Sequence, residues 1–107
     1  MSRYAKGVKN EKRSRYLLSQ NDYFCIESRG SHGAFDVVGV YLGKNPEQNP
    51  IVIFVQSKTN STFVSDEIKI LIPFFETVNK SLGRKIISIE HHNWKSYQRK
   101  PSIITLL

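Results

Sequence analysis

The stretch that decides the fold is residues 34–58, which read AFDVVGVYLGKNPEQNPIVIFVQSK. It holds two runs rich in Val, Ile and aromatic side chains, Ala34 to Leu42 and Ile51 to Val55, and such residues favour β-strands. The segment between them, Gly43 to Pro50, contains the Gly, Asn and Pro that are typical of turns. The three segments together predict a hairpin. Because both runs are almost continuously apolar, we expect strands that are covered on both faces.

Toward the N-terminus, the sequence predicts a helix from about Tyr4 to Gln20 and a strand from Tyr23 to Glu27. On a helical wheel the first helix has one inward half, which carries Gly7, Val8, Glu11, Ser14, Leu17 and Leu18. Its other half is basic and carries Lys6, Lys9, Lys12 and Arg13.

Toward the C-terminus, a second helix is expected to begin after Ser65, a residue type that commonly caps helices. Its apolar period continues to Leu82, and Gly83 is a suitable stop. Pro73 lacks a backbone N–H, so we expect a kink or a break there. The rest of the chain predicts a strand, a long turn and a last strand, at Lys85 to Glu90, Asn93 to Pro101 and Ile103 to Leu107.

The order of elements is therefore αβββαββ, which predicts a single α/β domain over residues 1–107 with a mixed central sheet flanked by helices. A chain of 107 residues is long enough for one domain with its own core. It contains 16 Lys and Arg against 9 Asp and Glu, a formal net charge of +7. This charge favours polyanionic partners, nucleic acid first and an anionic membrane second.

The sequence shows no sign of a membrane span or an exported protein. The apolar runs fall well short of the roughly 18 residues needed to cross a bilayer, and no apolar stretch follows the basic N-terminus as in a secretory signal. The single Cys25 excludes an internal disulfide and offers no zinc-site spacing. We expect a cytoplasmic protein that makes no membrane contact.

Polar residues interrupt the hairpin at positions that suggest a site. Asp36 breaks the first apolar run, and Gln56 and Lys58 follow the second. Gln56 and Lys58 are two residues apart and so point to the same face of a strand. Asp36 joins that face only if it pairs with one of them and not with Ser57. The spacing alone leaves this register open.

Glu11 is the acid that the first helix turns inward, and a buried charge needs a partner. One alternative is an ion pair with Arg15, one helical turn later. The other is a shared site, in which the Glu11 and Asp36 carboxylates and the Gln56 amide oxygen offer the hard oxygen ligands that Mg²⁺ prefers. Lys58 would then orient an attacking water or stabilise negative charge growing on a phosphate.

With these residues in place, the chain resembles the PD-(D/E)XK nuclease superfamily, in its branch of archaeal-type and phage Holliday junction resolvases and resolvase-like endonucleases. The resemblance covers nearly the whole chain. It is carried by Lys6-Gly7 followed by Glu11, by the run from Ser28 to Asp36, and by Val55-Gln56-Ser57-Lys58. It implies a restriction-endonuclease-like core, endonucleolytic cleavage of DNA, and Mg²⁺ or Mn²⁺ as the cofactor.

By the same resemblance, Glu11 and Asp36 would be metal ligands, joined by Gln56 and the backbone carbonyl of Ser57, with Lys58 as the catalytic lysine. The superfamily most often has Glu where this chain has Gln56, and one charge fewer predicts a lower metal affinity. Ser31 lies in the loop where resolvases place a functional serine. The residues expected to contact DNA, mainly through phosphates, are Arg3, Lys6, Lys9, Lys12, Arg13, Arg29, Ser31 and His32.

The predicted function is a structure-selective DNA endonuclease that resolves four-way junctions or other branched DNA. Two symmetric cuts need two active sites related by a two-fold axis, so the resemblance predicts a homodimer. Two alternatives stay open. The first is a general or partner-directed nuclease subunit, and the second is a catalytically weakened DNA-binding module in which Gln56 marks a decayed site.

Overall fold

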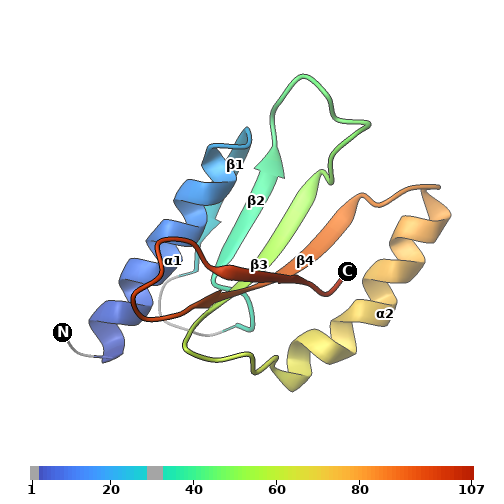
Figure 1. Ribbon diagram of the computed structural model, residues 1–107. Helices are drawn as coiled ribbons and strands as arrows, with labels where there is room; N and C mark the ends of the chain where they lie inside the picture. The colour runs from blue at the N-terminus through green and yellow to red at the C-terminus, as the bar shows by residue number, and fades with distance from the viewer. Residues whose placement is uncertain (1–2, 29–32) are drawn as a thin grey trace.

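The computed structural model describes residues 3–28 and 33–107. It is a five-stranded sheet with one helix on each face (Figure 1). The order of elements is the predicted αβββαββ. In chain order they are α1 (Arg3–Ser19), β1 (Tyr23–Glu27), β2 (Val37–Tyr41), β3 (Val52–Thr59), α2 (Asp66–Ser81), β4 (Ile87–Trp94) and β5 (Ser102–Thr105).

The strands lie side by side in sequence order, β1-β2-β3-β4-β5. Every neighbouring pair is antiparallel except β3 and β4, which are parallel. A parallel pair needs a crossover, and α2 provides it. The sheet is therefore mixed, as expected, and the predicted hairpin is present as β2 and β3, with Val37 paired to Val55.

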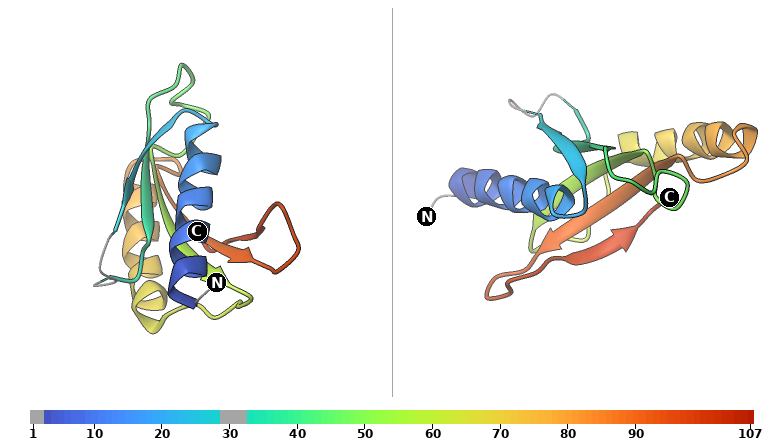
Figure 2. Two further views of the ribbon diagram at one scale, coloured as in Figure 1. Left: turned by 90° about the vertical axis from the view of Figure 1, so that its left-hand side faces the viewer. Right: turned by 90° about the horizontal axis from the view of Figure 1, so that it is seen from above.

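The two helices lie on opposite sides of the sheet (Figure 2, left). Helix α1 contacts β1, β2 and β3, while α2 contacts β4 and also reaches β3, where Phe75 stacks on Phe54 with ring centroids 5.2 Å apart. The core lies beneath α1, and its buried members are Leu18, Tyr23, Cys25, Val37, Tyr41, Ile53 and Val55.

Strand β3 is longer than its apolar run. It continues past Val55 to Thr59, and β4 continues past Glu90 to Trp94. The two extensions pair with each other, from Gln56 with His91 to Thr59 with Trp94. Each strand is therefore prolonged by a partner far away in the sequence, and residues 56–58 lie within a central strand instead of after it.

Helix α2 begins as predicted, because the Ser65 side chain accepts the backbone N–H of Ile68 at 3.4 Å. The expected break at Pro73 is wrong, since the helix is continuous from Asp66 to Ser81. Because Pro73 has no N–H, the carbonyl oxygen of Lys69, four residues earlier, lacks its helical donor. Both residues are exposed, so water can hydrate that carbonyl. Neither helix in the described part of the chain is long and apolar enough to cross a membrane.

Candidate functional site

The chain is irregular where Asp36 enters β2. Val37 pairs with Val55, and the backbone N–H of Asp36 also donates to the Val55 carbonyl oxygen, at 2.8 Å. Two consecutive residues thus meet one residue of β3, which is the arrangement of a β-bulge. The Asp36 carboxylate accepts the backbone N–H of Ser57 at 2.8 Å, so a side chain takes the place of a backbone acceptor at this end of the hairpin.

Glu11 of α1 lies near Asp36 at this point, close enough for each carboxyl group to affect the pKa of the other, and the two are called here the acid pair. Partial burial, and after it the negative charges of Asp36 and Glu27, raise the pKa of Glu11 to about 7. Burial also raises the pKa of Asp36, against the opposing effects of the Ser57 N–H and the Lys58 charge. Two carboxyl groups this close either share a proton or need a cation between them.

One expected alternative was an ion pair between Glu11 and Arg15. These two described residues form no such pair. Arg15 lies instead beside Glu27, with 3.9 Å between Nη1 and Oε1. Glu27 ends β1 and pairs with Val37, next to Asp36, so it adds negative charge beside the acid pair. The sequence held a signal for Glu27, because it ends an apolar strand just as Asp36 precedes one.

Gln56 does not join the acid pair, which differs from the expected ligand set. Residues two apart share a face of β3. Phe54 stacks on α2, so Gln56 belongs to the α2 face. Thr59 accepts a hydrogen bond from Asn10 of α1, which places Ser57 on the α1 face with Glu11.

The Gln56 amide is held by His91, its neighbour on β4. Gln56 Oε1 lies 3.1 Å from His91 Nδ1, and His91 Nε2 lies 2.8 Å from the Ser61 carbonyl oxygen. A neutral imidazole has one N–H, so both contacts are satisfied if His91 is protonated or if the amide turns its NH₂ group toward Nδ1. In either arrangement the buried amide is committed to His91.

The acid pair offers a small oxygen site. No group of three or more His, Cys, Asp and Glu side chains within residues 3–28 and 33–107 is placed to hold a metal ion. Ser57 Oγ and Glu27 Oε1 are buried beside the acid pair without a hydrogen-bond partner. Mg²⁺ is usually bound through one or two carboxylates and keeps several waters. Glu11 and Asp36, with the unpartnered Ser57 oxygen nearby, therefore fit such an ion without a third acid.

Lys58 is an exposed residue near the end of β3, close enough to Asp36 for its charge to oppose the rise in the pKa of that carboxyl. Lys58 shares the α2 face of β3 with Gln56, so it acts on Asp36 through its charge, and its role as the catalytic lysine stays a prediction. Arg29, Ser31 and His32 lie outside the described residues, and nothing is described of the Arg3 side chain.

The basic residues of α1 that were expected to contact DNA lie on another side of the helix from Glu11. Glu11 and Arg13 are two residues apart and therefore about 160° apart around the helix. Arg13 stacks on Trp94 with its guanidinium carbon 4.0 Å from the ring centroid. It also donates to the side chain of Asn10 and to the carbonyl oxygens of Gln98 and Arg99, at 3.1, 3.2 and 2.9 Å.

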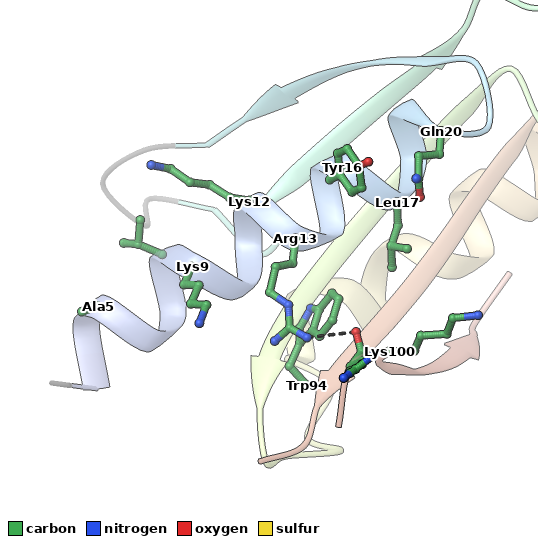
Figure 3. A pocket seen from close by; sticks show the side chains of 11 residues that line it. Ala5, Lys9, Lys12, Arg13, Tyr16, Leu17, Gln20, Trp94 and Lys100 are labelled. Atoms are coloured by element: carbon green, nitrogen blue, oxygen red, sulfur yellow. Dashed lines mark hydrogen bonds between the residues drawn. The ribbon is translucent and has the colours of Figure 1, made fainter. Parts of the chain in front are cut away.

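Two adjoining hollows lie along this side of α1, and we call them together the basic groove; Figure 3 shows the larger one. Their volumes are about 850 and about 300 Å³. The walls are α1, Thr59 and residues 94–100. Of the expected DNA-binding residues, the groove includes Lys6, Lys9, Lys12 and Arg13.

The chain matches no protein-family model, no curated protein and no solved structure. What the acid pair can do chemically follows from its own residues. Two carboxyl groups and an unpartnered hydroxyl oxygen lie near the end of a central strand, within reach of the charge of Lys58. This set can hold a hard cation and can move a proton at neutral pH.

Proposed function

We propose that this protein is a Mg²⁺-dependent DNA endonuclease whose active site is built on Glu11, Asp36 and Lys58. The observation that carries the proposal is the contact between the Glu11 and Asp36 carboxyl groups, which helps raise the pKa of Glu11 to about 7. A divalent cation relieves their repulsion and takes the place of the shared proton. The net charge of +7 favours a polyanionic substrate.

Each residue has a distinct role in this proposal. The Ser57 N–H holds the Asp36 carboxylate in a fixed orientation, at 2.8 Å. Mg²⁺ bound here would polarise the scissile phosphate and lower the pKa of water. Glu11 would hold the ion as a carboxylate, so its pKa of about 7 predicts that ion binding displaces a proton near neutral pH. Lys58 stabilises the negative charge that grows on the phosphate.

The proposed ligand set differs in one residue from that of the sequence. Gln56 is left out, and the unpartnered Ser57 Oγ is the additional oxygen near the two carboxyl groups. Asp36, which pairs with neither Gln56 nor Lys58 in a regular ladder, turns toward Glu11 through its bulge. The backbone carbonyl of Ser57 remains a candidate ligand by the family resemblance alone.

The proposed substrate is a four-way junction or other branched DNA, cut in the cytoplasm by a homodimer. A second copy could cover α2, which carries exposed apolar side chains at every fourth position. They are Ile70, Phe74, Val78 and Leu82. This spacing gives one apolar stripe along the helix, and large exposed apolar stripes commonly mark interfaces.

A cleavage assay on four-way, flap and linear duplex DNA of equal length tests the proposal. We expect Mg²⁺-dependent paired cuts in the four-way junction and little cleavage of the linear duplex. If all three substrates are cleaved equally, the protein does not select junctions, and the alternative of a general or partner-directed nuclease holds instead. Junction binding without cleavage in either Mg²⁺ or Mn²⁺ would leave only the weakened binding module.

The variant Lys58→Gln separates ion binding from chemistry. Lys58 offers no ligand atom while charged, so Mg²⁺ affinity measured by calorimetry should change by no more than about twofold. Loss of its charge beside the phosphate should lower the cleavage rate by roughly a hundredfold to a thousandfold. Lys44→Gln, at an exposed turn on the far side of the hairpin, is the matched control. Unchanged cleavage by Lys58→Gln would remove Lys58 from the site.

A further inference from the structure

The basic groove is built by two segments far apart in the sequence, helix α1 and the turn between β4 and β5. That turn lies on the same side of the sheet as α1 (Figure 2, left). In Figure 3, Arg13 extends from α1 to Trp94, and Lys100 lies across the hollow from the helix. The groove is therefore open to solvent between two separate walls.

The charge of the groove has one sign. Its larger hollow is lined by Lys9, Lys12, Arg99 and Lys100, and its smaller one by Lys6 and Lys95 as well as Lys9. No Asp or Glu of the described chain lines either hollow. Arg13 lies between them and is engaged with protein groups. The Lys and Arg side chains around it thus lack a fixed anionic partner in the groove and suit a chain of phosphates.

The groove also has an apolar floor and exposed rings. Val8, Leu17 and Trp94 line its larger hollow, and Arg13 covers the Trp94 ring. Tyr16 is 63% exposed on one wall, and Tyr97 at the tip of the turn is fully exposed. Phosphates need no rings, so this combination fits a ligand that carries both negative charge and planar apolar groups.

Arg13 positions the turn that forms the second wall. Its guanidinium stacks on Trp94 and donates to two carbonyl oxygens of the turn, those of Gln98 and Arg99. Asn60 supports the same turn from the end of β3, since its side chain bonds both the hydroxyl and the backbone N–H of Ser96, each at 2.9 Å. The groove is therefore preformed, which lowers the entropic cost of binding.

We propose that the basic groove binds a single-stranded segment of nucleic acid, with phosphates on its lysines and bases on Tyr16 and Tyr97. A duplex hides its bases and is too wide for hollows of this size, which are of the volume that takes small-molecule units. The inference rests on the proposed function only for the choice of nucleic acid as the substrate class. Because the groove and the acid pair lie on opposite sides of α1, the bound segment is an unpaired strand beside the cleavage point.

Binding of a fluorescent oligothymidylate tests the inference, measured by anisotropy in EDTA so that cleavage is suppressed. Lys9→Gln/Lys12→Gln/Lys100→Gln removes three groove charges, and Lys44→Gln/Lys80→Gln/Lys85→Gln removes three exposed charges elsewhere. We expect the groove variant to lose at least about tenfold in affinity, with a salt dependence shallower by about 2 in log–log slope. If both variants lose the same affinity, net charge alone explains the binding, and the groove is not the binding site.

The rings give a second, charge-independent test. Tyr16→Ala should weaken oligothymidylate binding by roughly 5- to 150-fold, as expected for the loss of one base stack. Tyr16→Phe keeps the ring and should bind like the unchanged protein. Phe74→Ala removes a similarly exposed ring on α2 and is the control. No effect of Tyr16→Ala and Tyr97→Ala, separately or together, would overturn the stacking role.

Other ligands and the proposed function give distinguishable outcomes. Trp94 is the only tryptophan and lines the groove floor, so its fluorescence should change when the oligonucleotide binds. A duplex of equal length that binds as tightly would overturn the single-strand assignment. Phosphatidylserine vesicles that bind in preference to the oligonucleotide would make the groove a membrane contact. If DNA cleavage fails but these groove results hold, only the nuclease proposal falls.

Discussion

The two sides of α1 differ in how their charges are balanced. On one side, Glu11 meets Asp36, and Lys58 is the cation that opposes the rise in the pKa of Asp36. On the other side, the lysines of the basic groove face no Asp or Glu within the described chain. The chain holds 16 Lys and Arg, yet within the described residues no ion pair joins any of them to Glu11 or Asp36.

This separation shows that the unbalanced charges on both sides are available to ligands of opposite sign. Unpaired like charges destabilise a fold, so a protein that keeps them apart forgoes some stability. The acid side fits a hard cation and the basic side fits a polyanion. A phosphodiester chain with its metal ion would satisfy both. The comparison therefore predicts that variants on one side leave the other side intact.

The largest effect is expected for Asp36→Ala. It removes a proposed metal ligand, so we expect Mg²⁺-dependent cleavage to fall by roughly a hundredfold to a thousandfold. The Ser57 N–H also loses its acceptor, which should lower the free energy of unfolding by about 1–3 kcal/mol. Cleavage and denaturant unfolding measure the two effects. Oligothymidylate affinity should stay within about twofold, and a larger loss would show that the two sides are coupled.

Arg13→Ala is the corresponding change on the basic side. It removes a cation–π contact and three hydrogen bonds, so the free energy of unfolding should fall by about 2 kcal/mol. The emission of Trp94 should shift to the red as the ring becomes exposed. Arg15→Ala is the control, because its partner Glu27 lies 3.9 Å away and the Arg15 side chain is 55% exposed, which should cost under about 1 kcal/mol. Equal effects of the two variants would deny Arg13 its positioning role.

Glu11→Gln should stabilise the protein in a pH-dependent way. The folded pKa of Glu11, about 7, lies above the ordinary glutamate value of 4.5, so the folded state binds more protons between these values and stability falls as pH rises through this window. At pH 8 the variant should be more stable by roughly 1 kcal/mol, after allowance for partial exposure, and below about pH 4 the difference should vanish.

Thermal unfolding at several pH values measures this effect, and the exposed Glu76→Gln is its control. Added Mg²⁺ should raise the melting temperature of the unchanged protein more than that of Glu11→Gln, because the ion binds the folded state. A pH-independent difference would contradict the contact between the two carboxyl groups. Equal stabilisation of both proteins by Mg²⁺ would contradict Glu11 as a ligand.

The smallest effect is expected for Gln56→Glu, which restores the commonest residue of the resembled superfamily. The new carboxylate would face His91 on the α2 side, so it should form an ion pair there. Mg²⁺ affinity measured by calorimetry should change by less than about twofold, since charges on the other face of the sheet are not ligands. A tenfold gain would place residue 56 in the metal site after all.

Much of the fold could be predicted because it depends on local patterns. Strand β1 follows from its short run of aromatic and apolar residues, the cap of α2 at Ser65 follows from capping chemistry, and the structure has both. The length of β3 could not be predicted, because its extension to Thr59 depends on pairing with β4. The expected break at Pro73 is absent, because the helix is continuous there and the proline lies on its exposed face. Which face is exposed depends on how α2 packs on the sheet.

For the site, the sequence by itself determined that Glu11 and Arg13 lie on opposite sides of one helix, since a period of 3.6 residues fixes their relative direction. Only the tertiary structure decided which groups each side meets. The bulge at Asp36 brings its carboxylate to Glu11, the pairing of β3 with β4 commits Gln56 to His91, and the turn at residues 94–100 closes the basic groove. The physical reason is that these contacts join residues distant in the chain, whose register depends on the packing of the whole sheet.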